Sequence, residues 1–216
     1  VGTLTLGSSI INLTVNAGTG WLAGTMTNLT VTANTATVNL TNTNFSSPTK
    51  DWNGLSLVWA SAGSAGITGT GGATLANITR TGTSAKTDSF SLGGNVTVTN
   101  TFTVNGNSGI NRVLVQSGTL GTPTTITTAN TSFSNVDFRD ITGAGAASWD
   151  LSAASGGSGN AGGNSMKALG DAAFTTATTW YWYADTGNWS NYAKWFDATG
   201  GTGNAMPSTR AVLPQD

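Results

Sequence analysis

The stretch VTVTNTFTVNGNSGINRVLVQSGTLGTPTTITTANTSFSNVDFRDITGAGAASWDL, from Val96 to Leu151, decides the fold. It consists of short runs of alternating apolar and polar residues, which Asn, Gly, Ser or Pro separate from one another. Because side chains alternate between the two faces of a strand, each run predicts a short β-strand with one apolar side. No run is long enough to form a core alone, so the strands must pack on one another.

The same kind of run recurs on both sides of this stretch. Strand centres are expected near residues 15, 31, 57, 76, 97, 114 and 137, about 16–26 residues apart. A period of about 20–25 residues is typical of a solenoid, in which each repeat stacks on the next. A β-sandwich is the alternative, since it also consists of many short strands. Low charge, small apolar residues and Thr and Asn that can form ladders along the stack favour the β-solenoid.

Composition supports an ordered all-β protein and excludes several kinds of site. Charged residues make up 8% of the 216 residues and the net charge is −1, against about 25% charged residues in ordinary domains. Glu is absent and strong helix formers are scarce, which argues against a helical protein. His and Cys are also absent, which excludes Ser-His-Asp triads, thiol catalysis and His or Cys metal centres. We expect no cofactor.

Charge and hydropathy also bear on partners. Nucleic acid is an unexpected partner because no basic patch is present. No apolar run reaches the 18 residues that a membrane-spanning helix needs. We expect the chain to associate with itself or with other surface proteins, and to contact cell-surface glycans.

Three segments are expected. Residues 1–151 should form the solenoid rungs, residues 152–174 a Gly-rich loop or linker, and residues 175–216 an aromatic-rich terminal module. The chain starts within the strand pattern at Val1 and stops at Asp216, so we expect a fragment or processed product with a truncated module.

A family resemblance covers about half of the chain, residues 112–216. It rests on the segments Asn111–Val115, Asn135–Ile141, Ser148–Leu151, Gly162–Asn164, Gly187–Ser190 and Val212–Asp216. In these segments the chain resembles β-helical repeat proteins of environmental bacteriophages and bacterial cell surfaces. The resemblance implies a right-handed parallel β-helix and an exterior location, but no particular activity.

Carboxylates are the only candidates for catalysis. Asp137 and Asp140 are three residues apart on an expected strand, so they would point to opposite faces and could not act jointly. We expect them to be corner residues that bind backbone amides. Together with Asp150 they could instead bind Ca²⁺ through oxygen ligands, although no known Ca²⁺ repeat is present.

The aromatic segment is the better candidate for ligand binding. It contains Trp180, Trp182, Trp189 and Trp195, and rigid amphipathic rings of this kind can stack on sugars. The alternative is that these rings pack as a cap or a subunit interface.

The sequence therefore predicts a non-catalytic structural or adhesive β-solenoid. The expected setting is a phage virion, as a tail fibre, spike or capsid-surface protein. A bacterial cell-surface adhesin or filament subunit is one alternative, and a polysaccharide-degrading tailspike-like enzyme is another.

Overall fold

The computed structural model describes residues 2–14, 19–22, 29–47, 50–52, 54–85, 87–149, 155–166, 181–183, 186, 192–196 and 199–201. Apart from two short 3-10 helices, the regular elements of these residues are β-strands, as the sequence predicts. The chain divides into two compact units, Val1–Phe174 and Thr175–Asp216. The second unit begins where the aromatic-rich segment was expected to begin.

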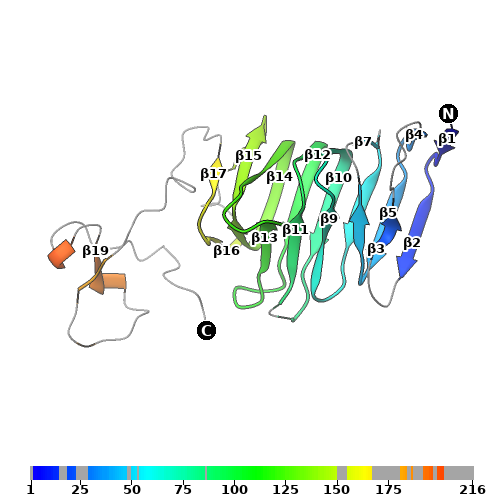
Figure 1. Cartoon of the computed structure of the whole chain (residues 1–216). Helices are drawn as coiled ribbons and strands as arrows, with labels where there is room; N and C mark the ends of the chain where they lie inside the picture. The colour runs from blue at the N-terminus through cyan, green and yellow to red at the C-terminus, as the bar shows by residue number, and fades with distance from the viewer. Residues whose placement is uncertain are drawn as a thin grey trace. The chain divides into compact units, whose positions relative to one another are not determined.

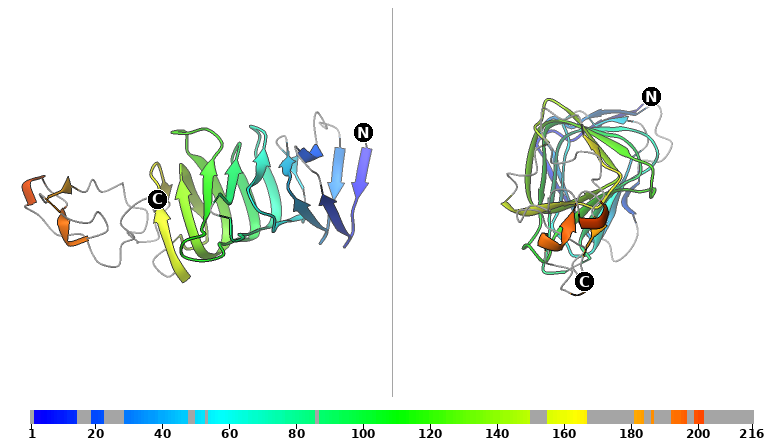
Figure 2. Two further views of the ribbon diagram at one scale, coloured as in Figure 1. Left: turned by 90° about the horizontal axis from the view of Figure 1, so that it is seen from below. Right: turned by 90° about the vertical axis from the view of Figure 1, so that its left-hand side faces the viewer.

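The first unit is a coil of parallel strands. Each turn of the coil, or rung, passes in order through three faces, which we name A, B and C. Figure 1 shows strands of successive rungs side by side, and Figure 2 (right) shows that the rungs superpose as one coil. Every strand pairing within this unit is parallel, with the strand of one rung bonded to its equivalent in the next. The structure thus confirms an all-β, solenoid-like fold.

Face A opens each rung. It contains β1 (Gly2–Thr5), β4 (Leu29–Thr32), β7 (Lys50–Asp51), the first parts of β10 (Ala73–Thr81), β12 (Val96–Asn105) and β14 (Thr124–Arg139), then β15 (Ile141–Gly145) and β17 (Ser165–Met166). The first residues of these strands are 17–28 residues apart along the chain, which is close to the predicted 16–26 and slightly wider.

Faces B and C complete the rungs. Face B contains β2 (Ile10–Thr14), β5 (Thr37–Thr41), β8 (Ser56–Trp59), the later parts of β10 and β12, and the middle of β14. Face C contains β3 (Thr19–Leu22), β6 (Asn44–Ser46), β9 (Ser64–Thr68), β11 (Ser89–Leu92), β13 (Val113–Ser117), the end of β14, and β16 (Ser155–Asn160).

Alternation along each strand places one column of side chains inside the coil. On face B the register aligns Leu40, Trp59, Arg80, Val104 and Phe133 in successive rungs. The first four of these residues are at most 1% exposed. Each fully buried apolar side chain of this size contributes about 1.5–3 kcal/mol through its removal from water.

Aromatic rings form a continuous chain through the interior. Ring centroids are 5.2 Å apart for Trp59 and Phe90, 6.0 Å for Phe90 and Phe102, and 5.7 Å for Phe102 and Phe133. Phe138 continues the chain at 5.2 Å from Phe133. These rings come from successive rungs, and their positions are spread along the chain from Trp59 to Phe138. The core therefore exists only when the rungs are stacked.

The Gly-rich segment differs from its prediction. Within residues 152–174, which were expected to be a loop or linker, Ser155–Asn160 forms β16 against β14 and Ser165–Met166 forms β17 against β15. Gly and Ser can extend a parallel ladder because its hydrogen bonds are made by the backbone. The solenoid therefore continues beyond residue 151.

The second unit contains one small described sheet. β18 (Tyr181–Trp182) pairs antiparallel with β19 (Trp195–Phe196). Two 3-10 helices, η2 (Tyr192–Lys194) and η3 (Thr199–Gly201), flank β19 in sequence. Across the described parts of both units, no helix is long and apolar enough to cross a membrane.

Candidate functional site

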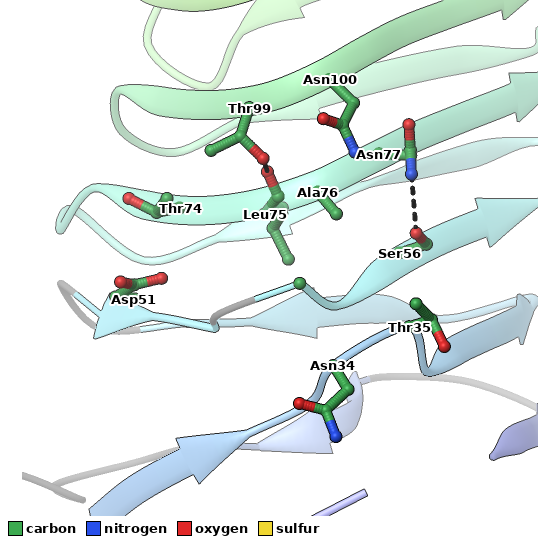
Figure 3. Close-up of a pocket in the computed structure, with 11 residues that line it drawn as sticks. Asn34, Thr35, Asp51, Ser56, Thr74, Leu75, Ala76, Asn77, Thr99 and Asn100 are labelled. Atoms are coloured by element: carbon green, nitrogen blue, oxygen red, sulfur yellow. Dashed lines mark hydrogen bonds between the residues drawn. The ribbon is translucent and has the colours of Figure 1, made fainter. Parts of the chain in front are cut away.

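A groove of about 460 Å³ lies on the side of the solenoid, where face A turns into face B (Figure 3). Its volume falls within the range of about 300–1,000 Å³ that is usual for small-molecule sites. Its walls come from four successive rungs. We call it the corner groove, and its lining residues are Asn34, Thr35, Asp51, Gly54, Ser56, Thr74, Leu75, Ala76, Asn77, Thr99 and Asn100.

Irregular backbone at each corner makes the groove. Asn34 has a positive φ of 47°, a conformation that Asn tolerates better than most residues. Gly54 in the next rung lies against it, and a Cβ at Gly54 would overlap the carbonyl oxygen of Asn34. In the two following rungs the strand register shifts between Leu75 and Asn77 and again beside Asn100.

Hydrogen bonds between rungs hold the polar wall in place. Asn77 Nδ2 donates to Ser56 Oγ at 3.0 Å, and the backbone N–H of Thr101 donates to Asn77 Oδ1 at 3.3 Å. Thr99 Oγ1 donates to the carbonyl oxygen of Leu75 at 3.3 Å. Asn34, Thr35, Thr99 and Asn100 are exposed, so their polar atoms can also reach a ligand.

The groove is poor in charge. Among the lining residues that the structure describes, Asp51 is the one ionisable residue, and none is Lys or Arg. A glycosidase of the usual type needs two carboxyl groups, one on each side of the scissile bond. The lining residues therefore suit binding through neutral hydrogen bonds better than acid–base catalysis.

A buried ion pair lies in the core of the solenoid, where sequence reasoning did not expect one. Arg80 Nη2 is 3.7 Å from Asp88 Oδ1, and both side chains are at most 1% exposed. Arg80 also donates to four backbone carbonyl oxygens, those of Ser61, Gly63, Thr81 and Ser89.

The Asp88 side chain is likewise held by several hydrogen bonds. Its carboxylate accepts hydrogen bonds from the backbone N–H of Gly63 at 2.7 Å, from the backbone N–H of Thr83 and from Thr83 Oγ1 at 2.9 Å. Burial acts to raise the pKa of Asp88, but these hydrogen bonds and the charge of Arg80 outweigh it and the pKa is lowered. Burial also lowers the pKa of Arg80, against the opposing effect of Asp88. The pair ties two corners of neighbouring rungs together and has a structural role.

Asp137 and Asp140, the two carboxylates considered in the sequence analysis, bind different partners. Asp140 has a positive φ of 53°, is buried, and accepts a hydrogen bond from the backbone N–H of Gly121 at 2.9 Å. It is therefore the corner residue that the sequence predicts. Asp137 instead pairs with Arg112 at 3.0 Å on the surface of β14. Asp150 lies outside the described residues.

Metal binding gains no support from this arrangement. Among the residues that the structure describes, no group of three carboxylate, His or Cys side chains could hold a metal ion.

The four Trp residues predicted to contact glycans are only partly described. Trp182 and Trp195 face each other across β18 and β19, with ring centroids 5.4 Å apart at 69°. Trp195 is 8% exposed and Trp182 is half-buried, so these two rings pack together within the described part of the second unit. The exposed rings nearby belong to Tyr181 and Tyr183. Trp180 and Trp189 lie outside the described residues.

Sequence reasoning missed the corner groove because its lining residues are spread over 67 positions, from Asn34 to Asn100. Only the register between rungs brings them together. The sequence signal for the groove is the Asn and Thr content of successive corners. By itself this content does not distinguish a binding surface from ordinary turns.

No protein-family model matches this chain, and no characterised protein or solved structure shows significant similarity to it.

Proposed function

We propose that this chain is a non-catalytic structural and adhesive β-solenoid that works on an exterior surface. The setting we propose is a phage virion, where it would serve as a tail fibre, a spike or a capsid-surface protein. This proposal follows the resemblance to β-helical repeat proteins of bacteriophages. The observation that carries it is the in-register stacking of rungs from β1 to β17 around one aromatic core.

Stacking of this kind supports a mechanical role. Each inner rung has both neighbours as hydrogen-bond partners, so few backbone groups of the strands are left for a protease to bind. Side chains add bonds between rungs, such as Asn39 Nδ2 to Asn12 Oδ1 at 2.7 Å and Ser134 Oγ to Asn105 Oδ1 at 3.0 Å. A stiff shaft that resists proteolysis suits an exterior environment.

We also propose that the coil is right-handed. A connection between two parallel strands of one sheet is right-handed in about 98% of cases, because of the twist of the strands. Each rung of this solenoid makes such connections, since its strands pair in parallel with those of the next rung.

The partners we propose are other copies of this chain or other surface proteins. Among the described strands, β1, β2 and β3 each pair on one side only. A strand edge of this kind can pair through its backbone groups with a preceding rung of the same chain or with a strand of another copy. Ile10 in β2 is also 70% exposed, which adds an apolar contact to this edge.

The experiment that tests this proposal locates the protein. Antibodies raised against the chain would be applied to phage particles and to bacterial cells from the same culture, and gold labels would be counted by electron microscopy. We expect labels on virions. Labels on bacterial surfaces would favour the adhesin alternative, and protein found only free in solution would contradict an exterior structural role.

A second assay addresses the enzyme alternative. The chain would be incubated with host capsular polysaccharide, and the length of the polymer would be followed by size-exclusion chromatography. We expect an unchanged polymer, because Asp51 is the one carboxylate among the described lining residues of the corner groove. A shortened product would overturn the non-catalytic proposal.

A further inference from the structure

We infer that the corner groove binds a neutral oligosaccharide chain that lies along the stacking direction of the solenoid. This inference rests on the proposed function, because it assigns the adhesive role to a particular surface. It also moves that role from the aromatic segment, where the sequence predicted it, to the side of the solenoid.

The shape of the groove favours a repeating ligand. It crosses four rungs at equivalent corners, and neighbouring strands in a sheet are about 4.7–4.9 Å apart. Each step along the groove therefore presents a new corner with its own polar side chains. A pyranose unit in an extended glycan advances by a similar distance, so successive sugars can meet successive rungs.

The chemistry of the walls favours sugar hydroxyl groups. Asn34 and Asn100 are exposed amides in rungs at opposite ends of the groove, and the exposed hydroxyl of Thr35 lies beside the first. Amides can both donate and accept hydrogen bonds, as sugar hydroxyls do. The bond between Asn77 and Ser56 fixes the middle of the wall before a ligand arrives, which lowers the entropic cost of binding.

The charge of the groove narrows the ligand class. Leu75 and Ala76 line it between the polar corners, as Figure 3 shows, but both residues are buried (0% and 6% exposed), so the exposed polar residues at the corners supply the contacts with a ligand. None of the lining residues that the structure describes is cationic, and Asp51 adds a negative charge. Glycans that carry carboxylate or sulfate groups would therefore be repelled, whereas neutral glycans would be accepted.

The Trp pair that the structure describes in the aromatic segment provides weaker support for the same role. Stacking on a sugar requires an exposed ring face, and the ring of Trp195 is buried against Trp182. The corner groove, in contrast, has exposed polar groups, and its volume is large enough to hold part of an oligosaccharide.

The test is a binding measurement on the full chain. The probes are hexasaccharides of neutral glucose, mannose, galactose and N-acetylglucosamine polymers, with a polygalacturonate hexasaccharide as the anionic comparison, and isothermal titration gives the affinities. We expect saturable binding of at least one neutral probe and none of the anionic probe.

Substitutions then locate the site. Thr99→Trp places a large ring in the groove from an exposed position and should weaken binding at least about tenfold. Thr122→Trp, at an exposed position outside the groove, is the matched control and should leave the affinity unchanged. Asn34→Gly keeps the positive φ that this corner requires and removes the amide, so together with Asn100→Ala it should weaken binding about fivefold to tenfold.

Three outcomes would overturn the inference. They are no binding of any neutral probe, equal loss in Thr99→Trp and Thr122→Trp, or loss in Trp189→Ala with Thr99→Trp unaffected. Should Thr99→Trp not fold, the variant with Asn34→Gly and Asn100→Ala replaces it. Labels on virions together with any of these outcomes would reject the groove alone and leave the exterior structural role standing.

Discussion

The two units of the chain use similar aromatic side chains in opposite circumstances. In the solenoid, Trp59, Phe90 and Phe102 are fully buried because rings from three rungs meet inside the coil. In the second unit, Trp182 and Trp195 meet across two strands of two residues each. From this difference we expect an aromatic ring to stabilise the protein more when rungs are stacked on both sides of it than when it packs against a single ring.

The largest expected effect comes from breaking the aromatic chain. Phe102→Ala removes a fully buried ring that contacts Phe90 and Phe133, and should lower the free energy of unfolding by about 3–5 kcal/mol. Urea denaturation followed by circular dichroism measures this loss. Trp195→Ala is the comparison, and it should leave the solenoid transition in place. Equal losses in the two variants would contradict the proposed difference between the units.

The next effect comes from the buried ion pair. Arg80→Met keeps an unbranched apolar side chain in the core column but leaves Asp88 without its cation, and should cost about 3 kcal/mol. The double variant Arg80→Met and Asp88→Asn should recover part of this loss, because it removes the unpaired buried charge. A double variant less stable than Arg80→Met alone would contradict the account of the pair.

The same pair predicts a dependence of stability on pH. The pKa of Asp88 is lowered in the folded state, whereas an unfolded Asp has a pKa of about 3.9. The stabilisation is therefore fully present above the unfolded pKa. It declines as pH falls toward the folded pKa, with a slope of at most about 1.4 kcal/mol per pH unit from this one group. Urea titrations between pH 5 and pH 2 should show a shallower decline in Asp88→Asn, and identical slopes would contradict the assignment.

The smallest effect concerns the polar ladders on the surface. Asn39→Ala removes an exposed hydrogen bond of 2.7 Å to Asn12 and should cost less than about 1 kcal/mol. Thermal unfolding measures it, with Thr122→Ala as a control outside the ladder. A loss as large as that of Phe102→Ala would show that side-chain ladders, and not the aromatic core, hold the rungs together.

Alternation in the sequence was sufficient to predict the strands with bulky inward residues. β13 and the end of β14 have Val or Phe at every second position, and β10 and β12 have similar alternation on each side of a register shift. β9 and β16 were missed because Gly, Ala and Ser dominate them. At Gly66 in β9 the reason is physical, since a Cβ there would overlap the carbonyl oxygen of Ser91 in the next rung.

The core ion pair and the groove show two different limits of sequence reasoning. Arg80 lies two residues after Ile78, so strand parity placed it inside, although its charge is typical of a surface residue. Its partner Asp88 lies on the far side of a corner, and no local pattern relates them. The corner groove requires the register of four rungs, and a shift of one residue in any rung would turn its polar side chains inward.

The measurement that tests the central claim most directly is disulfide cross-linking, because the chain contains no Cys of its own. Thr103 and Ser132 are register partners on β12 and β14, and parallel neighbours at about 4.8 Å are within disulfide reach. Oxidation of the double variant Thr103→Cys and Ser132→Cys should give a fast, quantitative intramolecular disulfide. Thr103→Cys with Ser134→Cys, two residues out of register, should not react. Equal reaction of both pairs, or of neither, would contradict the in-register stack on which the proposed shaft and its groove depend.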